Sequence, residues 1–334
     1  MSHNKKILQG LLTAEAENRL HHAYILAGPA SRAKLECVEM FAAEIFSKSG
    51  EQGLFGNAGG SSGRELERVQ GRNHPDFSRL DAVEGKLGID EVRELPRILA
   101  FAPLEAKRRV VVLPEAAAMN AQAANCILKT LEEPPPHSMF FLLCREPSEL
   151  LQTIVSRCQV LRFAPLSDDE LLAQLEGKEG EAKDAILAFS EGALERAELL
   201  LADEGLLALR KEACERLLEL WEASPRIPSK AALWVEKIEG EERVQVVLDS
   251  WEILLRDLAF VKGGASAGHL RFRDCHPRLE AVASKASSVD EIAQRSSAIN
   301  RFRVYRRLNG NLRLDLAALL SELQILLGKG PGLA

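Results

Sequence analysis

Four short apolar runs, spread over the first 165 residues and separated by helical patterns, constrain the fold of this chain most strongly. They are AYIL at 23–26, VVVL at 110–113, MFFLLC at 139–144 and QVLRF at 159–163, with a weaker strand signal in HPDFSRL at 74–80. Short buried strands that alternate with helices are typical of βαβ units. Residues 1–165 are therefore predicted to form an α/β domain with a parallel sheet.

The apolar spacing between these strands predicts helices. We expect them at 5–20, at 32–46, at 88–103 beginning near Asp90, at 120–133 and at 147–158. Pro134-Pro135-Pro136 should end the fourth helix, because proline cannot continue the hydrogen-bond ladder. The Gly/Ser-rich stretch at 49–63 has the composition of a flexible loop.

After residue 165 the pattern becomes almost entirely helical. Ser167 and Glu170 have the spacing of a capping box at the start of the first such helix. Breaks in the pattern divide the remainder into a small helical domain at 166–207 and a larger all-helical domain at 208–330.

Composition narrows the class of protein. The chain has 334 residues, 46% hydrophobic and 28% charged, with a net charge of -6. No stretch approaches the roughly 20 apolar residues that span a bilayer, and the first 20 residues do not resemble a signal peptide. We expect a soluble cytoplasmic protein. Its mild acidity argues against a strongly electrostatic DNA binder acting alone.

Six cysteines lie far apart in the sequence, and no C-x-x-C pair is present. They are Cys37, Cys126, Cys144, Cys158, Cys214 and Cys275. Reduced thiols in the core and scattered metal ligands are the two readings, and the spacing favours the first. No metal site is predicted.

The segment GPASRAKL, from Gly28 to Leu35, stands where a phosphate-binding loop would follow the first strand. A working loop, G-x-x-x-x-G-K-[ST], needs glycine before its lysine and a hydroxyl after it. Here Ala33 precedes Lys34, and Leu35 supplies no ligand for Mg²⁺. Gly28, Pro29 and Lys34 remain as candidate nucleotide-binding residues of a degenerate and non-functional loop.

The end of the VVVL strand points the same way. A phosphate-loop ATPase needs an acidic residue there to hold Mg²⁺ and orient water, and Pro114 stands in the first such position. Glu115 is read either as an exposed strand-end charge or as a remnant of the acidic site. Loss at two coupled positions predicts that the chain does not hydrolyse ATP.

Two motifs make a family resemblance specific. Residues 127–135, ILKTLEEPP, and the tripeptide Ser156-Arg157-Cys158 resemble hallmarks of the bacterial clamp-loader AAA+ family. HHAYILAGP, HPDF and the C-terminal RRLNGNLRLDLAALL are similar to further family segments. The resemblance implies an AAA+ (RecA-like) domain with a parallel sheet, a small helical lid domain and an all-α collar domain.

Within the family, the chain resembles a member with a defective nucleotide site that keeps its SRC arginine. The resemblance implies that Arg157, with Ser156 and Cys158, supplies an arginine finger to ATP bound by a neighbouring subunit. The implied partners are the motor subunits gamma and tau, the delta subunit, the sliding clamp and primed DNA. Family members carry a four-cysteine zinc module near 49–63. This chain has no cysteine between Cys37 and Cys126, so no zinc is expected.

Several alternatives stay open at this level. Arg157 could simply satisfy helix-end carbonyls or form a surface ion pair. The stretch 301–307, RFRVYRR, could contact neighbouring subunits or DNA phosphates. The chain could instead be an active AAA+ ATPase that tolerates Ala33 and Leu35, or a scaffold that acts outside a clamp loader.

Overall fold

The computed structural model describes residues 3–49, 62–83, 87–177, 180–222, 234, 238, 240–265, 270–272, 276–286, 288–306 and 312–328. Residues 50–61 of the predicted loop, Cys275 and Arg307 lie outside the described residues. The chain divides into two compact units, Met1–Pro165 and Leu166–Ala334. The finer division of the second unit at 207 stays a prediction.

The first unit is built on a five-stranded sheet. Its strands are β1 (Ala23–Ala27), β2 (Phe77–Arg79), β3 (Arg109–Leu113), β4 (Ser138–Cys144) and β5 (Gln159–Arg162), in the order β2-β3-β4-β1-β5. Every neighbouring pair is parallel. The predicted α/β domain with a parallel sheet is confirmed.

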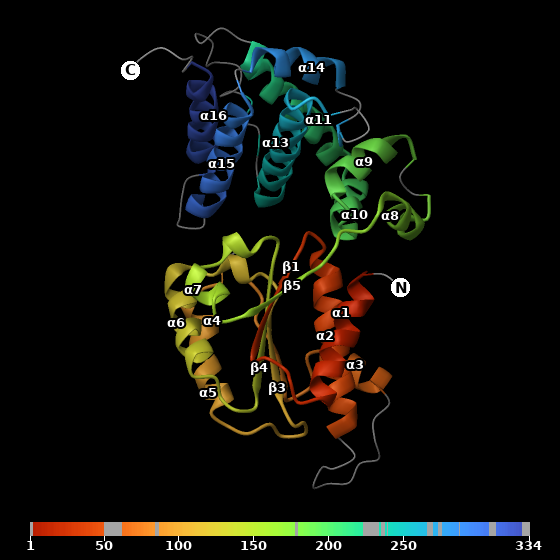
Figure 1. Cartoon of the computed structure of the whole chain (residues 1–334), viewed down its shortest axis with the longest axis vertical. Coiled ribbons are helices and arrows are strands. Elements are labelled where there is room, and N and C mark those ends of the chain that lie inside the picture. Colours follow the sequence, from red (N-terminus) through yellow and green to blue (C-terminus); the bar gives the residue numbers. More distant parts are fainter. Residues whose placement is uncertain are drawn as a thin grey trace. The chain divides into compact units, whose positions relative to one another are not determined.

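Helices cover both faces of this sheet (Figure 1). On one face lie α1 (His3–Ala16), α2 (Ser31–Ser49) and α3 (Ser62–Gln70), and on the other α4 (Ile89–Arg93), α5 (Leu95–Leu99), α6 (Ala121–Glu132) and α7 (Gln152–Val155). Successive strand residues face opposite sides, so Tyr24 and Leu26 join one core, and Ile25 and Ala27 the other. Burial on both faces explains why the strands read as continuous apolar runs.

Three helix predictions need correction. The helix expected over 88–103 is two short helices, α4 and α5, because Pro96 begins a new helix and cannot continue the previous one. The segment 147–158 forms a short 3-10 turn (Pro147–Glu149) and α7, with an extended Leu150 between them. The N-terminal helix ends at Ala16 rather than at residue 20.

Other boundaries follow the predicted signals. Helix α6 ends at Glu132, just before the three prolines, and Asn120 caps its start by accepting from the backbone N–H of Ala123. Helix α3 was not foreseen, and it takes residues 62 and 63 from the predicted loop.

The second unit is helical throughout its described residues. Its helices are α8 (Asp168–Leu175), α9 (Lys183–Ser190), α10 (Leu194–Ala202), α11 (Glu204–Glu222), α13 (Glu241–Lys262), α14 (His276–Lys285), α15 (Val289–Arg306) and α16 (Leu312–Gly328). A 3-10 turn at Gly180–Ala182 directly precedes α9. The Ser167–Glu170 capping box forms as predicted. The fully buried Trp251 anchors the core, and its indole N–H donates to the carbonyl of Ala213 at 2.8 Å.

Candidate functional site

The segment Gly28–Leu35, predicted to be a degenerate phosphate loop, begins at the carboxyl end of β1, where connections to the two sides of the sheet diverge. Ligands of open α/β sheets bind at such a point. Gly28 has φ +152°, and a Cβ there would lie 2.5 Å from the carbonyl oxygen of Phe163. Its N–H donates to the carbonyl of Cys144 at the end of β4. Only glycine fits this position, because a side chain would collide with the neighbouring backbone.

Lys34 returns to the sheet from the first turn of α2. Its Nζ donates to the carbonyl oxygen of Gly28 at 2.5 Å and to that of Cys144 at 2.6 Å. The residue is 1% exposed. Lys34 therefore links the carboxyl ends of β1 and β4, because its Nζ donates hydrogen bonds to backbone carbonyls at both.

The end of β3 is the second place where the sequence predicts that a group needed for ATP hydrolysis is missing. Pro114 follows the strand directly, and the next residue, Glu115, is exposed. Partial desolvation raises the pKa of the Glu115 carboxyl, and the nearby Asp81 raises it further. Glu115 thus lies at the correct edge of the sheet, without the strand-end carboxylate that would precede it.

The SRC tripeptide forms the turn between α7 and β5. Ser156 is exposed, and its hydroxyl donates to the carbonyl of Thr153 at 3.1 Å. Cys158 packs against the core on the α6 side of the sheet. Burial raises the pKa of its thiol to about 12, so the thiol is protonated at neutral pH.

Arg157 lies at the surface in this turn, with 36% of its side chain exposed. Its Nη1 donates to the carbonyl of Thr153 at 3.0 Å, and its Nη2 lies 2.8 Å from Oε1 of Glu132. Glu132 is the last residue of α6, so the two motifs that carried the resemblance meet in space. Both contacts are of the kinds that the sequence analysis left open for Arg157, a helix-end carbonyl and a surface ion pair. The partner Glu132 was not predicted, since 25 positions and the whole of β4 separate the two residues.

The buried Asp76 of the HPDF motif fixes a second region. Its carboxylate accepts the backbone N–H groups of Leu104, Glu105 and Ala106 at 2.8–2.9 Å. Arg109 Nη2 lies 3.4 Å from the same carboxylate, and Nη1 donates to the carbonyl of Ile98. Asp76 therefore has a structural role that the sequence analysis did not identify.

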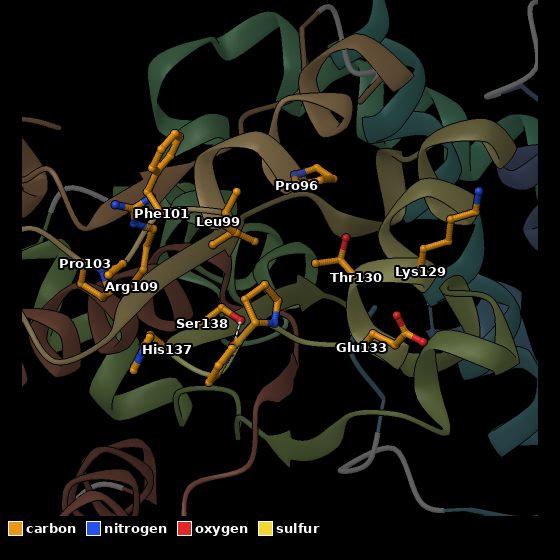
Figure 2. Close-up of a pocket in the computed structure, with 14 residues that line it drawn as sticks. Pro96, Leu99, Phe101, Pro103, Arg109, Lys129, Thr130, Glu133, His137 and Ser138 are labelled. Carbon is orange, nitrogen blue, oxygen red and sulfur yellow. Dashed lines mark hydrogen bonds between the residues drawn. The ribbon is translucent and has the colours of Figure 1, made fainter.

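A surface hollow of about 650 Å³ opens beside this segment (Figure 2). In Figure 2 Phe101 and Pro103 lie on one side of the hollow. Thr130 of α6 and Glu133, the C-cap of that helix, lie on the other side. Phe101 is 71% exposed. Lys34 and Arg157 do not line the hollow.

The arginine-rich stretch of α15 is engaged within the chain. Arg303 Nη2 lies 2.5 Å from Asp249 and 3.1 Å from Glu252, and Arg301 lies 2.5 Å from Glu322. Phe302 between them is buried. These contacts leave the choice between subunit and DNA contacts untested.

Metal and membrane features were searched among the described residues alone. Within those ranges, no three His, Cys, Asp or Glu side chains gather in a cluster that could hold a metal ion. No described helix is both long and apolar enough to cross a bilayer. None of the five described cysteines forms a disulfide.

Comparison with known proteins places the first unit. A family model described as "DNA polymerase III, delta subunit" matches residues 3–167. DNA polymerase III subunit delta' of Bacillus subtilis (strain 168) is 31% identical over 173 residues, 51% of each chain. The delta' subunit of Pseudomonas aeruginosa is 32% identical over 224 residues, 61% of this chain and 66% of that protein. The first unit, over residues 3–167, therefore belongs to the DNA polymerase III delta' family.

The family model covers the first unit, and the chain spans about half to two thirds of the length of these two relatives. DNA polymerase III subunit tau of Bacillus subtilis is also similar, at 28% identity over 173 residues, 52% of this chain and 29% of that protein. The delta' and tau identities differ little, so the residues of the site must carry the choice between a delta'-like and a tau-like function.

Proposed function

We propose that this chain is a clamp-loader subunit of DNA polymerase III that does not hydrolyse ATP. It presents Arg157 as an arginine finger to ATP bound by a neighbouring subunit. A guanidinium keeps its charge, binds phosphate oxygens through two parallel N–H groups and stabilises the charge that develops during phosphoryl transfer.

One observation supports the proposal: 36% of the Arg157 side chain is exposed in the turn after α7, while the loop lysine of the same chain is buried and bound to its own backbone. Lys34 is the residue that would hold the β- and γ-phosphates in a working loop. Leu35 and Pro114 remove the groups that would hold Mg²⁺. The chain keeps a group that can act on another subunit's nucleotide and lacks those needed to act on its own.

The proposed partners follow from the clamp-loader assignment. They are the ATP-binding motor subunits gamma and tau, the delta subunit, the sliding clamp and primed DNA. The neighbour holds the nucleotide, and this chain binds no ATP or zinc of its own. The helical second unit is proposed to assemble with the other subunits.

The decisive experiment reconstitutes the complex with wild-type partners and either wild-type or Arg157→Ala chain. An arginine finger contributes about 10³–10⁵ in rate at the site it serves. We therefore expect the variant to silence one neighbouring site, with DNA-stimulated ATP turnover falling by that site's share. Co-purification of the variant with the motor subunit shows that the assembly remains intact.

Three results would contradict the proposal. Unchanged DNA-stimulated turnover with Arg157→Ala would remove the arginine finger. Mg²⁺-dependent ATP turnover by the isolated wild-type chain would identify an active motor subunit instead. A chain that fails to co-purify with the motor subunit would favour a separate scaffold.

A further inference from the structure

The ion pair between Arg157 and Glu132 joins the proposed finger to a neighbouring helix of its own chain. Nη2 lies 2.8 Å from Oε1 of Glu132, while Nη1 is bound to Thr153 O at 3.0 Å and lies 3.4 Å from Ser156 Oγ. Both terminal nitrogens of the guanidinium are thus engaged by acceptors of this chain. A phosphate that binds through both nitrogens has to replace at least one of them.

The position of Glu132 is fixed by packing. Leu131 and Ile127 of the same helix are buried in the core, and the prolines from Pro134 onwards begin two residues later. Glu132 itself is half exposed. The backbone therefore holds this carboxylate beside the turn after α7, and little rearrangement of α6 is available to withdraw it.

Helix stability does not account for an acidic side chain here. Glu132 is the last residue of α6, where the aligned peptide dipoles disfavour negative charge, and the adjacent Glu133 adds a second carboxylate. Arg157 forms an ion pair with Glu132. This contact gives the carboxylate a favourable partner at a position that the helix dipole disfavours.

We propose that Glu132 is a positioning residue that holds Arg157 in the free chain and is exchanged for phosphate when the chain docks on a nucleotide-bound neighbour. This inference rests on the proposed function. An exposed ion pair contributes little, so a phosphate in a closed interface can displace it. Nη2 then passes from Glu132 Oε1 to a phosphate oxygen. Because the phosphate replaces the Glu132 carboxylate as the partner of Arg157, docking depends on nucleotide being bound to the neighbouring subunit.

The test measures the dissociation constant of the full-length chain for a motor subunit loaded with a non-hydrolysable ATP analogue. We expect Glu132→Gln to lower this constant about two- to five-fold, the size of one exposed ion pair. Glu133→Gln is the matched control. It removes the same charge one residue away, on a side chain that lines the hollow of Figure 2, and should change nothing.

A double variant isolates the pair. In an Arg157→Ala background, Glu132→Gln should have no further effect, because the group that it restrains is absent. In the free chain, Glu132→Gln should speed the modification of Arg157 by phenylglyoxal, followed by mass spectrometry. Glu132→Asp, which restores the charge, should restore at least part of the restraint in both measurements.

The outcomes separate the two proposals. If Arg157→Ala silences a neighbouring site but Glu132→Gln leaves or weakens docking, the exchange is overturned and the finger stands. If Arg157→Ala changes neither turnover nor docking, the finger is overturned and the exchange with it. Equal effects of Glu132→Gln and Glu133→Gln would reduce the result to general charge and overturn the exchange.

Discussion

The loop after β1 and the turn after α7 each hold one basic side chain, and their surroundings differ. Lys34 is 1% exposed and bound to two backbone carbonyls, whereas 36% of the Arg157 side chain is exposed beside a half-exposed carboxylate. A buried group contributes to stability through the bonds that its loss would leave unmade. An exposed ion pair contributes about 0–1 kcal/mol and can be exchanged. The comparison separates a buried basic residue that is bound to backbone carbonyls from a partly exposed one whose ion pair can be exchanged.

The most direct test of this contrast compares how substitution of each basic residue changes the free energy of unfolding. Lys34→Met keeps most of the buried volume but removes the partner of two carbonyls, so the free energy of unfolding should fall by about 2–4 kcal/mol. Arg157→Ala should lower it by no more than about 1 kcal/mol. Urea unfolding of the isolated chain measures both.

Function should respond in the opposite order. Below its unfolding temperature, Lys34→Met should leave the ATP turnover of the reconstituted complex unchanged, while Arg157→Ala should not. A stable Lys34→Met chain that abolishes turnover would show that the loop still serves a nucleotide, and the contrast between the two regions would fail.

Gly28→Ala tests the loop through its backbone. The added Cβ meets Phe163 O at 2.5 Å, and φ +152° is strained for any L side chain, so we expect a loss of about 2–3 kcal/mol in unfolding free energy. Gly10→Ala is the control, since its Cβ meets nothing within 4 Å inside α1. That change should stabilise the chain by about 0.5–1 kcal/mol. An unchanged free energy of unfolding in Gly28→Ala would mean that the loop is not packed against the end of β5.

Cys144 gives a smaller expected effect than Lys34 or Gly28, and its effect depends on pH. Burial raises the pKa of its thiol from 9.0 to about 12. Stability from this group is complete below pH 9 and is lost as the pH rises towards 12, because the unfolded thiol ionises first. The loss at pH 10 should be on the order of 1 kcal/mol. Cys144→Ala should flatten the decline between pH 8 and pH 10 in urea unfolding by this amount. An identical decline in both chains would contradict it.

Local signals predicted much of the fold. The proline run marks the end of α6, and the Ser167–Glu170 capping box marks the start of α8. Both signals were readable in the sequence because they act within one helical turn. The break at Pro96 was also visible in the sequence and was outweighed by the apolar spacing around it. Helix α3 was missed because its sequence is strongly polar and its first two residues belong to the Gly/Ser-rich stretch that predicted a loop.

The candidate site was predictable in its residues and not in its contacts. The altered loop and the SRC tripeptide identified Lys34 and Arg157 by type and spacing. Asp76 binding three N–H groups and Glu132 meeting Arg157 join segments that lie 28–30 and 25 positions apart. Such partners depend on the order of strands in the sheet, which no local pattern encodes.

The sequence by itself determined the alternation of strands and helices, the loss of the loop's glycine and hydroxyl, and the presence of one arginine in a specific tripeptide. These follow from short-range physics, namely side-chain periodicity, backbone freedom and the chemistry of single residues. Only the tertiary structure decided that Lys34 turns onto the carbonyls of two strands while Arg157 stays at the surface against Glu132. The reason is that burial and pairing are set by which segments the parallel sheet brings together, and these segments are distant in the chain.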